Sequence, residues 1–130
     1  MKKYMLMASV LIAMVACQES LEQKAAKEAS TYTRKSCPVV LNENVVMDSM
    51  TFDKDTHTFG YHYRLTGVMD NDSMINAEEM RQKLLAGVKN MTTARVYMEK
   101  GYNFQYVYRS DNDPKKILLD LLFTEKDYKQ

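Results

Sequence analysis

Few side chains in this 130-residue sequence are suited to covalent chemistry. The chain has two cysteines, Cys17 and Cys37, and two histidines, His57 and His62. It contains no Cys-x-x-Cys pair, no HExxH pattern, no Gly-x-Ser-x-Gly elbow and no glycine-rich phosphate loop. The sequence therefore predicts no catalytic residues and no cofactor, and we expect that the protein is not an enzyme. A hydrolase or redox enzyme assembled from distant residues is the least favoured alternative.

Metal ligands are equally sparse. His57 and His62 are five residues apart, and an odd separation on a regular strand points two side chains to opposite faces. The Asp-rich segments 53–55, 70–72 and 111–113 lack the glycine and the distant glutamate of an EF-hand loop. Turn chemistry is the favoured interpretation of these segments, because Asp and Asn accept hydrogen bonds from nearby backbone N–H groups. A weak calcium site is the alternative, and we expect no metal.

The first residues have the layout of an export signal. Lys2 and Lys3 precede an apolar run over residues 5–15, which is too short to cross a hydrocarbon core of about 30 Å. The run ends in Met14-Val15-Ala16-Cys17, which resembles the lipobox of bacterial lipoproteins. The resemblance implies that residues 1–16 are a signal peptide and that Cys17 is acylated. A buried N-terminal helix is the alternative.

The residue after the lipobox bears on the destination. Gln18 stands where Asp would be the common signal for retention at the inner membrane. The resemblance therefore favours a cell-envelope lipoprotein in the outer membrane of a Gram-negative bacterium, on its periplasmic or surface face. The protein would meet the membrane through its N-terminal acyl chains.

The charge balance argues against nucleic acid as a partner. The whole chain has 18 basic and 17 acidic residues, and the signal removes only Lys2 and Lys3. The remaining basic residues are dispersed along the sequence, so we expect neither nucleic-acid binding nor a second, electrostatic membrane anchor. Cys37 is then the one thiol left, and a structurally inert cysteine is favoured over a disulfide between two molecules.

The composition divides the mature chain in two. Residues 17–36 combine the lipidated cysteine with a polar segment rich in Ala, Glu and Lys, which predicts a flexible tether. Residues 37–130 predict a single α+β domain. Its sheet would have four antiparallel strands, in the order ββααββ along the chain, with helices packed on one face.

Several local patterns support this order. A strand near 44–52 and the alternating residues 57–65 predict a hairpin, and residues 102–109 and 117–123 predict two further strands. Asn76 and Glu79 have capping-box spacing ahead of an amphipathic helix that ends near Asn90. Thr92 or Thr93 would start a shorter helix, and Gly101 would end it.

Tyrosines are the most informative side chains for recognition. One row follows the second strand and one follows the third, and their large apolar bodies with polar tips suit a wet binding surface. The alternative, which is favoured, is that the rows face the helices as core with hydroxyl groups at the rim. The candidate binding residues are Tyr61, Tyr63, Tyr102, Tyr106 and Tyr108.

From Cys37 onward the sequence resembles a family of small exported bacterial lipoproteins of uncharacterised function. The carrying residues are Cys37-Pro38, the segment 41–52, the stretch from Gly101 to Arg109, and residues 123–128. Relatives often have further cysteines that could pair with the one before the proline, and none remains here. We therefore expect a non-enzymatic binding module whose partner is an envelope protein or a glycan. A small-ligand carrier or inhibitor domain with a Tyr-rich sheet face is the alternative.

Overall fold

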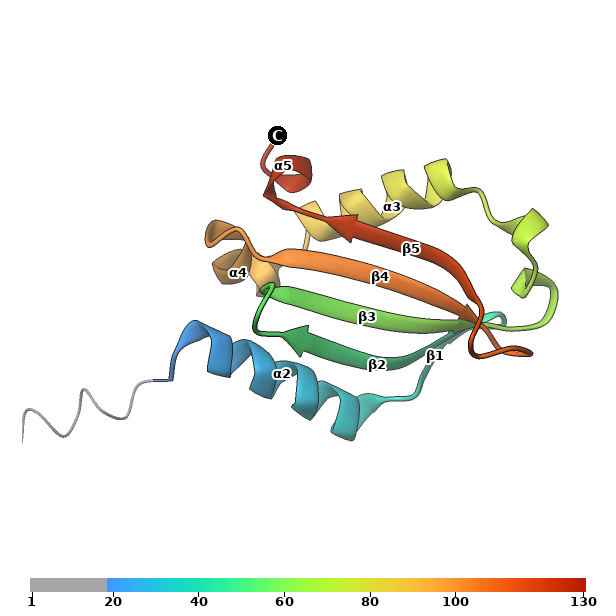
Figure 1. Ribbon diagram of the computed structural model, residues 1–130, viewed down its shortest axis with the longest axis horizontal. Coiled ribbons are helices and arrows are strands. Elements are labelled where there is room, and N and C mark those ends of the chain that lie inside the picture. Colours follow the sequence, from blue (N-terminus) through green and yellow to red (C-terminus); the bar gives the residue numbers. More distant parts are fainter. Residues whose placement is uncertain (1–18) are drawn as a thin grey trace, which may run out of the picture.

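The computed structural model describes residues 19–130, which form a five-stranded mixed sheet with helices packed against it (Figure 1). The predicted signal peptide, residues 1–16, and Cys17 lie outside the described residues. The strands follow one another in space in chain order: β1 Val39–Asn42, β2 Val45–Asp53, β3 Thr58–Leu65, β4 Asn103–Ser110 and β5 Ile117–Phe123. The helices are α2 Leu21–Ser36, α3 Ala77–Lys89, α4 Arg95–Glu99 and α5 Glu125–Tyr128, joined by short 3-10 turns at 67–69, 72–74 and 92–94.

The α+β class is confirmed, but the prediction of four strands is wrong. Ahead of the strand predicted near 44–52, residues 39–42 form a separate edge strand, β1, which pairs antiparallel with β2. Asn42 and Asn44 separate the two strands, because the backbone N–H of Asn44 donates to Asn42 Oδ1 at 2.8 Å. This is an Asx turn, and it reverses the chain within a stretch that otherwise has strand composition.

The prediction of an all-antiparallel sheet is also wrong, because β3 and β4 are parallel. Residues 66–102 carry the chain from the end of β3 back to the start of β4 through α3 and α4 (Figure 1). A connection of this length can return along the whole sheet, whereas a short turn would have forced antiparallel pairing. The two flanking hairpins, β2–β3 and β4–β5, are antiparallel.

The prediction of a flexible tether fails over most of residues 17–36. Helix α2 begins with a capping box formed by Ser20 and Gln23 and packs along β2. Its inward face consists largely of Ala25 and Ala29, which are 0% and 2% exposed. Two small side chains let the helix backbone approach the strand closely. This face adds little hydrophobicity to the sequence, so composition alone suggested a polar linker.

The predicted helix after Asn76 is present. Asn76 Oδ1 accepts a hydrogen bond from the backbone N–H of Glu79 at 3.1 Å. The shorter helix comprises a 3-10 turn followed by α4, and Gly101 leaves it with φ of 75°. Helix α5 was not predicted, although Thr124 and Asp127 form a capping box at its start.

The core lies on one face of the sheet. Alternate residues of β3, β4 and β5, such as Phe59, Phe104 and Phe123, join one buried cluster with α2, α3, α4 and α5. The helices therefore cover this face, and the opposite face carries His62, Gln105 and other polar side chains. Among the described residues, no helix is both long and apolar enough to span a membrane.

Candidate functional site

Four of the candidate tyrosines lie in one stack on the helix-covered face of the sheet. The parallel register of β3 and β4 pairs Tyr61 with Tyr106 and Tyr63 with Tyr108. The ring centroids are 4.8 Å apart in the first pair and 4.7 Å apart in the second, and both pairs are stacked. Tyr63 also stacks on Tyr106 at 6.2 Å, which links the two pairs. These four tyrosines therefore lie on the side of the sheet that the helices cover, as the favoured interpretation of the tyrosine rows predicts.

The fifth candidate, Tyr102, lies apart from this stack. It is buried just before β4, where its ring stacks on His57 at 4.6 Å and on Phe52 at 5.7 Å. Its backbone carbonyl accepts a hydrogen bond from the Tyr128 hydroxyl at 2.7 Å. Tyr102 thus fastens α5 and the β2–β3 turn to the sheet.

A cavity of about 580 Å³ opens over the first part of the tyrosine stack. Tyr61, Tyr63 and Tyr106 contribute to its lining, with Glu28 and Tyr32 of α2 along one side. The region around Met91 and α4 forms the other side. Three methionines also line it, at positions 47, 50 and 91.

A second cavity, of about 440 Å³, lies over the other part of the stack. Tyr108 and Leu65 contribute to its lining, and the side toward α3 carries Met80 and Lys83. Three methionines line this cavity too, at positions 69, 74 and 80. Methionine side chains are unbranched and polarisable, so they fit apolar partners of irregular shape.

Leu41 joins the two cavities, because it lines both of them. The pairing of β1 with β2 is irregular between Val40 and Asn42, so Leu41 is the extra residue of a bulge. A bulge can redirect a side chain, and Leu41 is 53% exposed at the junction of the cavities. We call the two cavities together the Tyr/Met groove.

Burial keeps the phenol groups of this groove neutral. It raises the pKa of Tyr61, Tyr63 and Tyr106 well above the usual range of tyrosine, and it raises the pKa of Tyr108 to about 12. The nearby Glu28 carboxylate and neighbouring tyrosines add to the shift for Tyr61 and Tyr106. At neutral pH these groups are hydrogen-bond donors and acceptors and not bases or nucleophiles.

The tyrosine hydroxyls differ in their partners. Tyr61 donates to Met91 Sδ at 3.7 Å. Within residues 19–130, the hydroxyls of Tyr63, Tyr106 and Tyr108 have no hydrogen-bond partner, and no fully buried side-chain oxygen is left unpaired. These three hydroxyls therefore reach the groove, where a bound segment could pair with them.

The two histidines lie outside the groove. His57 Nε2 contacts Glu22 Oε1 of α2 at 2.8 Å, in the turn before β3 and not on a strand. His62 lies on the opposite face of the sheet, where it contacts Thr51 at 3.0 Å and Arg109 at 3.1 Å. The groove therefore contains no imidazole group.

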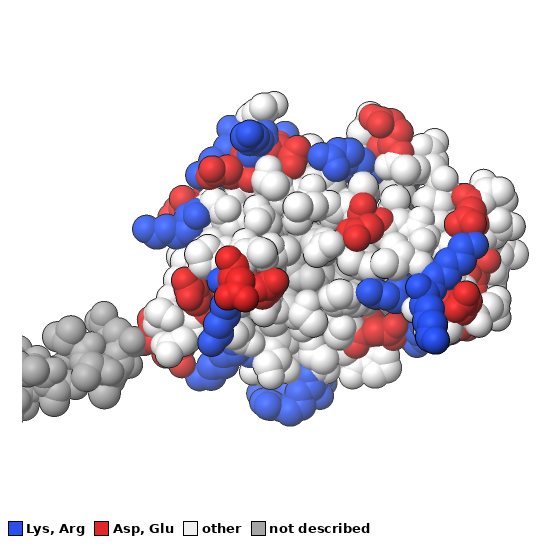
Figure 2. Space-filling model, in the orientation of Figure 1, with Lys and Arg blue, Asp and Glu red and all other residues white. Residues whose placement is uncertain are grey.

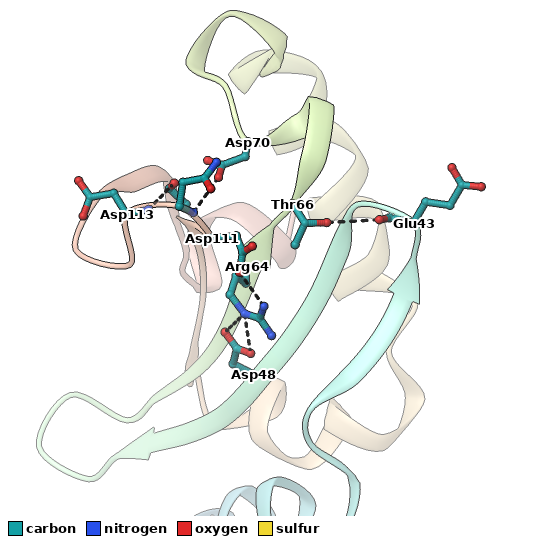
Figure 3. Close-up of polar contacts among 9 residues, drawn as sticks. Glu43, Asp48, Arg64, Thr66, Asp70, Asp111 and Asp113 are labelled. Atoms are coloured by element: carbon teal, nitrogen blue, oxygen red, sulfur yellow. Dashed lines mark hydrogen bonds and ion pairs between the residues drawn. The ribbon is translucent and has the colours of Figure 1, made fainter.

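The Asp-rich segments 70–72 and 111–113 form turns and ion pairs at one end of the sheet (Figure 3), and segment 53–55 lies in the β2–β3 turn at the other end, where Asp53 Oδ1 accepts from the backbone N–H of Asp55 at 2.9 Å. Arg64 lies between Asp48 and Asp111, with nitrogen–oxygen distances of 3.2 Å and 2.8 Å, and Asp70 accepts from the backbone N–H of Asn112 at 2.9 Å. Hydrogen bonds from Ser110 and Asn112 lower the pKa of Asp70. These contacts agree with the turn interpretation of the segments. Within residues 19–130, no three His, Cys, Asp or Glu side chains are grouped as a metal site.

Sequence reasoning identified the tyrosines but missed the rest of the groove. The methionines are scattered over five separate segments, and no period connects them. Glu28 and Tyr32 were assigned to a tether, so they were not expected beside the sheet. The one available signal was the capping-box spacing of Ser20 and Gln23, which marks the start of α2.

The fold is shared with small bacterial proteins of known structure. A candidate secreted protein from Pseudomonas aeruginosa superposes with a TM-score of 0.67 at 15% identity, over 85% of this chain and 99% of that one. The type II secretion pilotin EpsS from Vibrio vulnificus gives 0.66 at 13%, over 83% and 91%. The type II secretion pilotin AspS from Vibrio cholerae gives 0.61 at 17%, over 88% and 98%. At these identities the likeness defines the fold.

Residues 20–119 match a family model described as Domain of unknown function (DUF8479). The chain belongs to this family. A comparison with curated proteins gives no significant match. The matched range begins at the N-cap of α2, so the family domain includes this helix.

Proposed function

We propose that this protein is a non-enzymatic binding module of the bacterial cell envelope that holds an apolar segment of a partner protein in the Tyr/Met groove. One observation carries the proposal: two adjoining cavities share a floor of four stacked tyrosines, and the hydroxyl groups of Tyr63, Tyr106 and Tyr108 have no partner in residues 19–130. Aromatic residues and methionine are enriched in protein interfaces, and a groove beside helices is a common binding site for apolar segments.

The location rests on the N-terminal sequence and on the relatives. The lipobox-like residues Met14 to Cys17 support acylation of Cys17 and attachment to the outer membrane of a Gram-negative cell. The proteins that share the fold include two secretion-system pilotins and a candidate secreted protein. An exported protein that works by binding fits both observations.

Site-specific photo-crosslinking in the producing cell tests the groove. A photoreactive phenylalanine analogue placed at Leu41 or Met74, which line the groove and are about half exposed, should form one defined adduct with an envelope protein. Val40 and Val68 are matched controls, because they are 73% and 71% exposed and line neither cavity. Adducts of equal yield at all four positions would argue against a groove-bound partner.

A charge in the groove should abolish the same complex. In Leu41→Asp, a carboxylate would have to be desolvated against the bound apolar segment, which is costly. Val40→Asp adds the same charge to the neighbouring residue outside the groove. Partner recovery from membranes should fall at least tenfold in the first variant and stay unchanged in the second.

A small-ligand carrier is the second candidate. Its support is the size of the larger cavity, about 580 Å³, which lies within the range of about 300–1,000 Å³ for small-molecule sites. Native mass spectrometry of the protein purified from membranes would detect a retained lipid or other apolar ligand. Loss of that ligand in Leu41→Asp would favour the carrier, and an empty protein with a protein adduct would favour the binding module.

A further inference from the structure

The four basic residues of α2 point in the same direction. Lys24, Lys27, Arg34 and Lys35 are all exposed. At 100° per residue they occupy roughly 100° of the helix circumference, on the side away from Ala25 and Ala29, which face the sheet. Figure 2 shows Lys and Arg side chains along the lower rim of the molecule, where Figure 1 places α2.

The acidic residues of α2 do not neutralise the positive charge of this face. Glu22 contacts His57 Nε2 at 2.8 Å, and Glu28 accepts a hydrogen bond from the Tyr97 hydroxyl at 2.7 Å. Both glutamates thus have a partner in the domain. Glu28 is nevertheless exposed and lies beside Lys24, Lys27 and Lys35, so four basic residues face this one carboxylate of the helix. Glu19, which precedes the helix, contacts Lys27 at 3.4 Å, and both side chains are more than half exposed. An exposed pair of this kind is weak and does not hold Lys27 away from another anion.

The sequence places this basic face close to the expected anchor. Cys17 lies four residues before Leu21, the first residue of α2. Four extended residues span at most about 14 Å. An acylated Cys17 in the lipid leaflet would therefore keep the first turn of α2 within about 14 Å of the headgroups. Attraction between charges extends over about 8–10 Å at ordinary salt.

We propose that the outward face of α2, formed by Lys24, Lys27, Arg34 and Lys35, binds the anionic phospholipid headgroups of the leaflet that holds the anchor. The proposal deepens the proposed function, because it rests on the same membrane location. The acyl chains would attach the protein to the bilayer, and the basic face of α2 would fix the orientation of the domain on it. Mixed lysine and arginine side chains on an exposed helix suit such a surface.

Vesicle binding by an acyl-free chain tests the lipid contact separately from the anchor. A chain that starts at residue 17 and carries Cys17→Ser retains every residue of the described fold. Vesicles of phosphatidylglycerol and phosphatidylcholine in equal parts should sediment this chain, and vesicles of phosphatidylcholine alone should not. Binding should weaken by about fivefold for each basic residue removed, and raised salt should weaken it further.

Two fourfold variants give a matched comparison. The test variant is Lys24→Gln, Lys27→Gln, Arg34→Gln and Lys35→Gln, and four losses of about fivefold each should weaken its binding to the anionic vesicles by several hundredfold. The control removes four exposed lysines elsewhere, Lys89→Gln, Lys100→Gln, Lys115→Gln and Lys126→Gln, and it should bind as the parent does. Equal loss in both variants, or no binding by the parent, would overturn the proposal.

The anchor is judged by a different measurement. The intact mass of the full chain purified from bacterial membranes reports whether Cys17 is acylated. If Cys17 is acylated but the acyl-free chain does not bind anionic vesicles, the proposal that α2 binds lipid headgroups is refuted and the anchor is not. An unmodified Cys17 would refute the anchor, while the vesicle result would still decide whether α2 binds anionic lipid.

Discussion

At the scale of single residues, a few polar side chains hold separate parts of the fold together. The Thr33 hydroxyl of α2 donates to the backbone carbonyl of Met50 at 2.7 Å and accepts from the backbone N–H of the same residue at 2.9 Å. Met50 lies just beyond the irregular pairing of β2 with β3. The Thr33 side chain thus forms hydrogen bonds with both the backbone N–H and the backbone carbonyl of Met50, a residue at the edge of the core.

Thr33→Val should therefore destabilise the protein more than a comparable change beside it. The valine keeps the shape of threonine but leaves the Met50 backbone groups without their partner, which should cost about 1–3 kcal/mol. Thr31→Val is the matched control, since the Thr31 hydroxyl has no hydrogen bond to the rest of residues 19–130. Urea unfolding of both variants would measure the difference, and equal midpoints would contradict the role of Thr33.

His62 should give the stability of the protein a measurable pH dependence. Arg109 can only donate, so His62 Nδ1 is the acceptor in their contact and Nε2–H donates to Thr51. Burial, and then the Arg109 charge, lower the pKa of His62 from 6.5, and the charges of Asp120 and Asp48 oppose this shift without reversing it. The unfolded chain therefore takes up the proton first as the pH falls. Stability declines below about pH 6.5 until the folded protein also protonates His62.

The measurement is the unfolding free energy of the wild type and of His62→Gln between about pH 7.5 and pH 5. The wild type should lose more stability over this range than the variant, because glutamine has no proton to take up. Parallel curves for the two proteins would show that His62 protonates equally well in the folded and unfolded states.

At the scale of elements, helix α2 is the largest departure from expectation. The hairpins, the helix after Asn76 and the strand at 103–110 were predictable, because alternation and capping are local signals. The parallel pairing of β3 with β4 and the position of α2 were not, since both depend on contacts between segments far apart in the sequence. The tyrosines of the candidate site were found from their alternation. Leu41 was not, because its orientation depends on a bulge that only the pairing reveals.

Enlarging the inward face of α2 should separate the helix from the sheet. Ala25 is fully buried, so Ala25→Leu would insert three carbon atoms where there is no space and cost about 1–3 kcal/mol. Ala86→Leu makes the same change at an exposed position of α3 and should alter stability by less than about 0.5 kcal/mol. Thermal unfolding compares the two, and a neutral Ala25→Leu would mean that α2 is not packed as described.

At the scale of the whole molecule, α2 belongs to the folded domain. The family match begins at residue 20, and Ala25 is part of the same buried cluster as Phe104 and Tyr97. Glu28 and Tyr32 of this helix also line the Tyr/Met groove. A protein without α2 would lose both a part of its core and one side of its candidate site.

Limited digestion with trypsin should show this directly. Lys24, Lys27, Arg34 and Lys35 lie in a helix that is held to the sheet, so cleavage at these sites should be slow. Lys115 and Lys116 in the exposed β4–β5 turn should be cut first. Mass spectrometry of early fragments identifies the sites. Rapid cutting after Lys27 or Lys35 would indicate a loose N-terminal segment.

The parallel pairing of β3 and β4 has a consequence for the order of folding. Every residue pair between β3 and β4 joins positions that are 45 apart in the sequence, such as Thr58 and Asn103. The other neighbouring strands are connected by short turns. Distant pairings are slow to form, because the loop between them must first be ordered. Residues 39–65 form a three-stranded antiparallel unit and residues 103–123 form a hairpin, and the strand pairs within each are close in sequence. The tyrosine stack spans the pairing of β3 with β4, so the candidate site can form only once these two strands have paired.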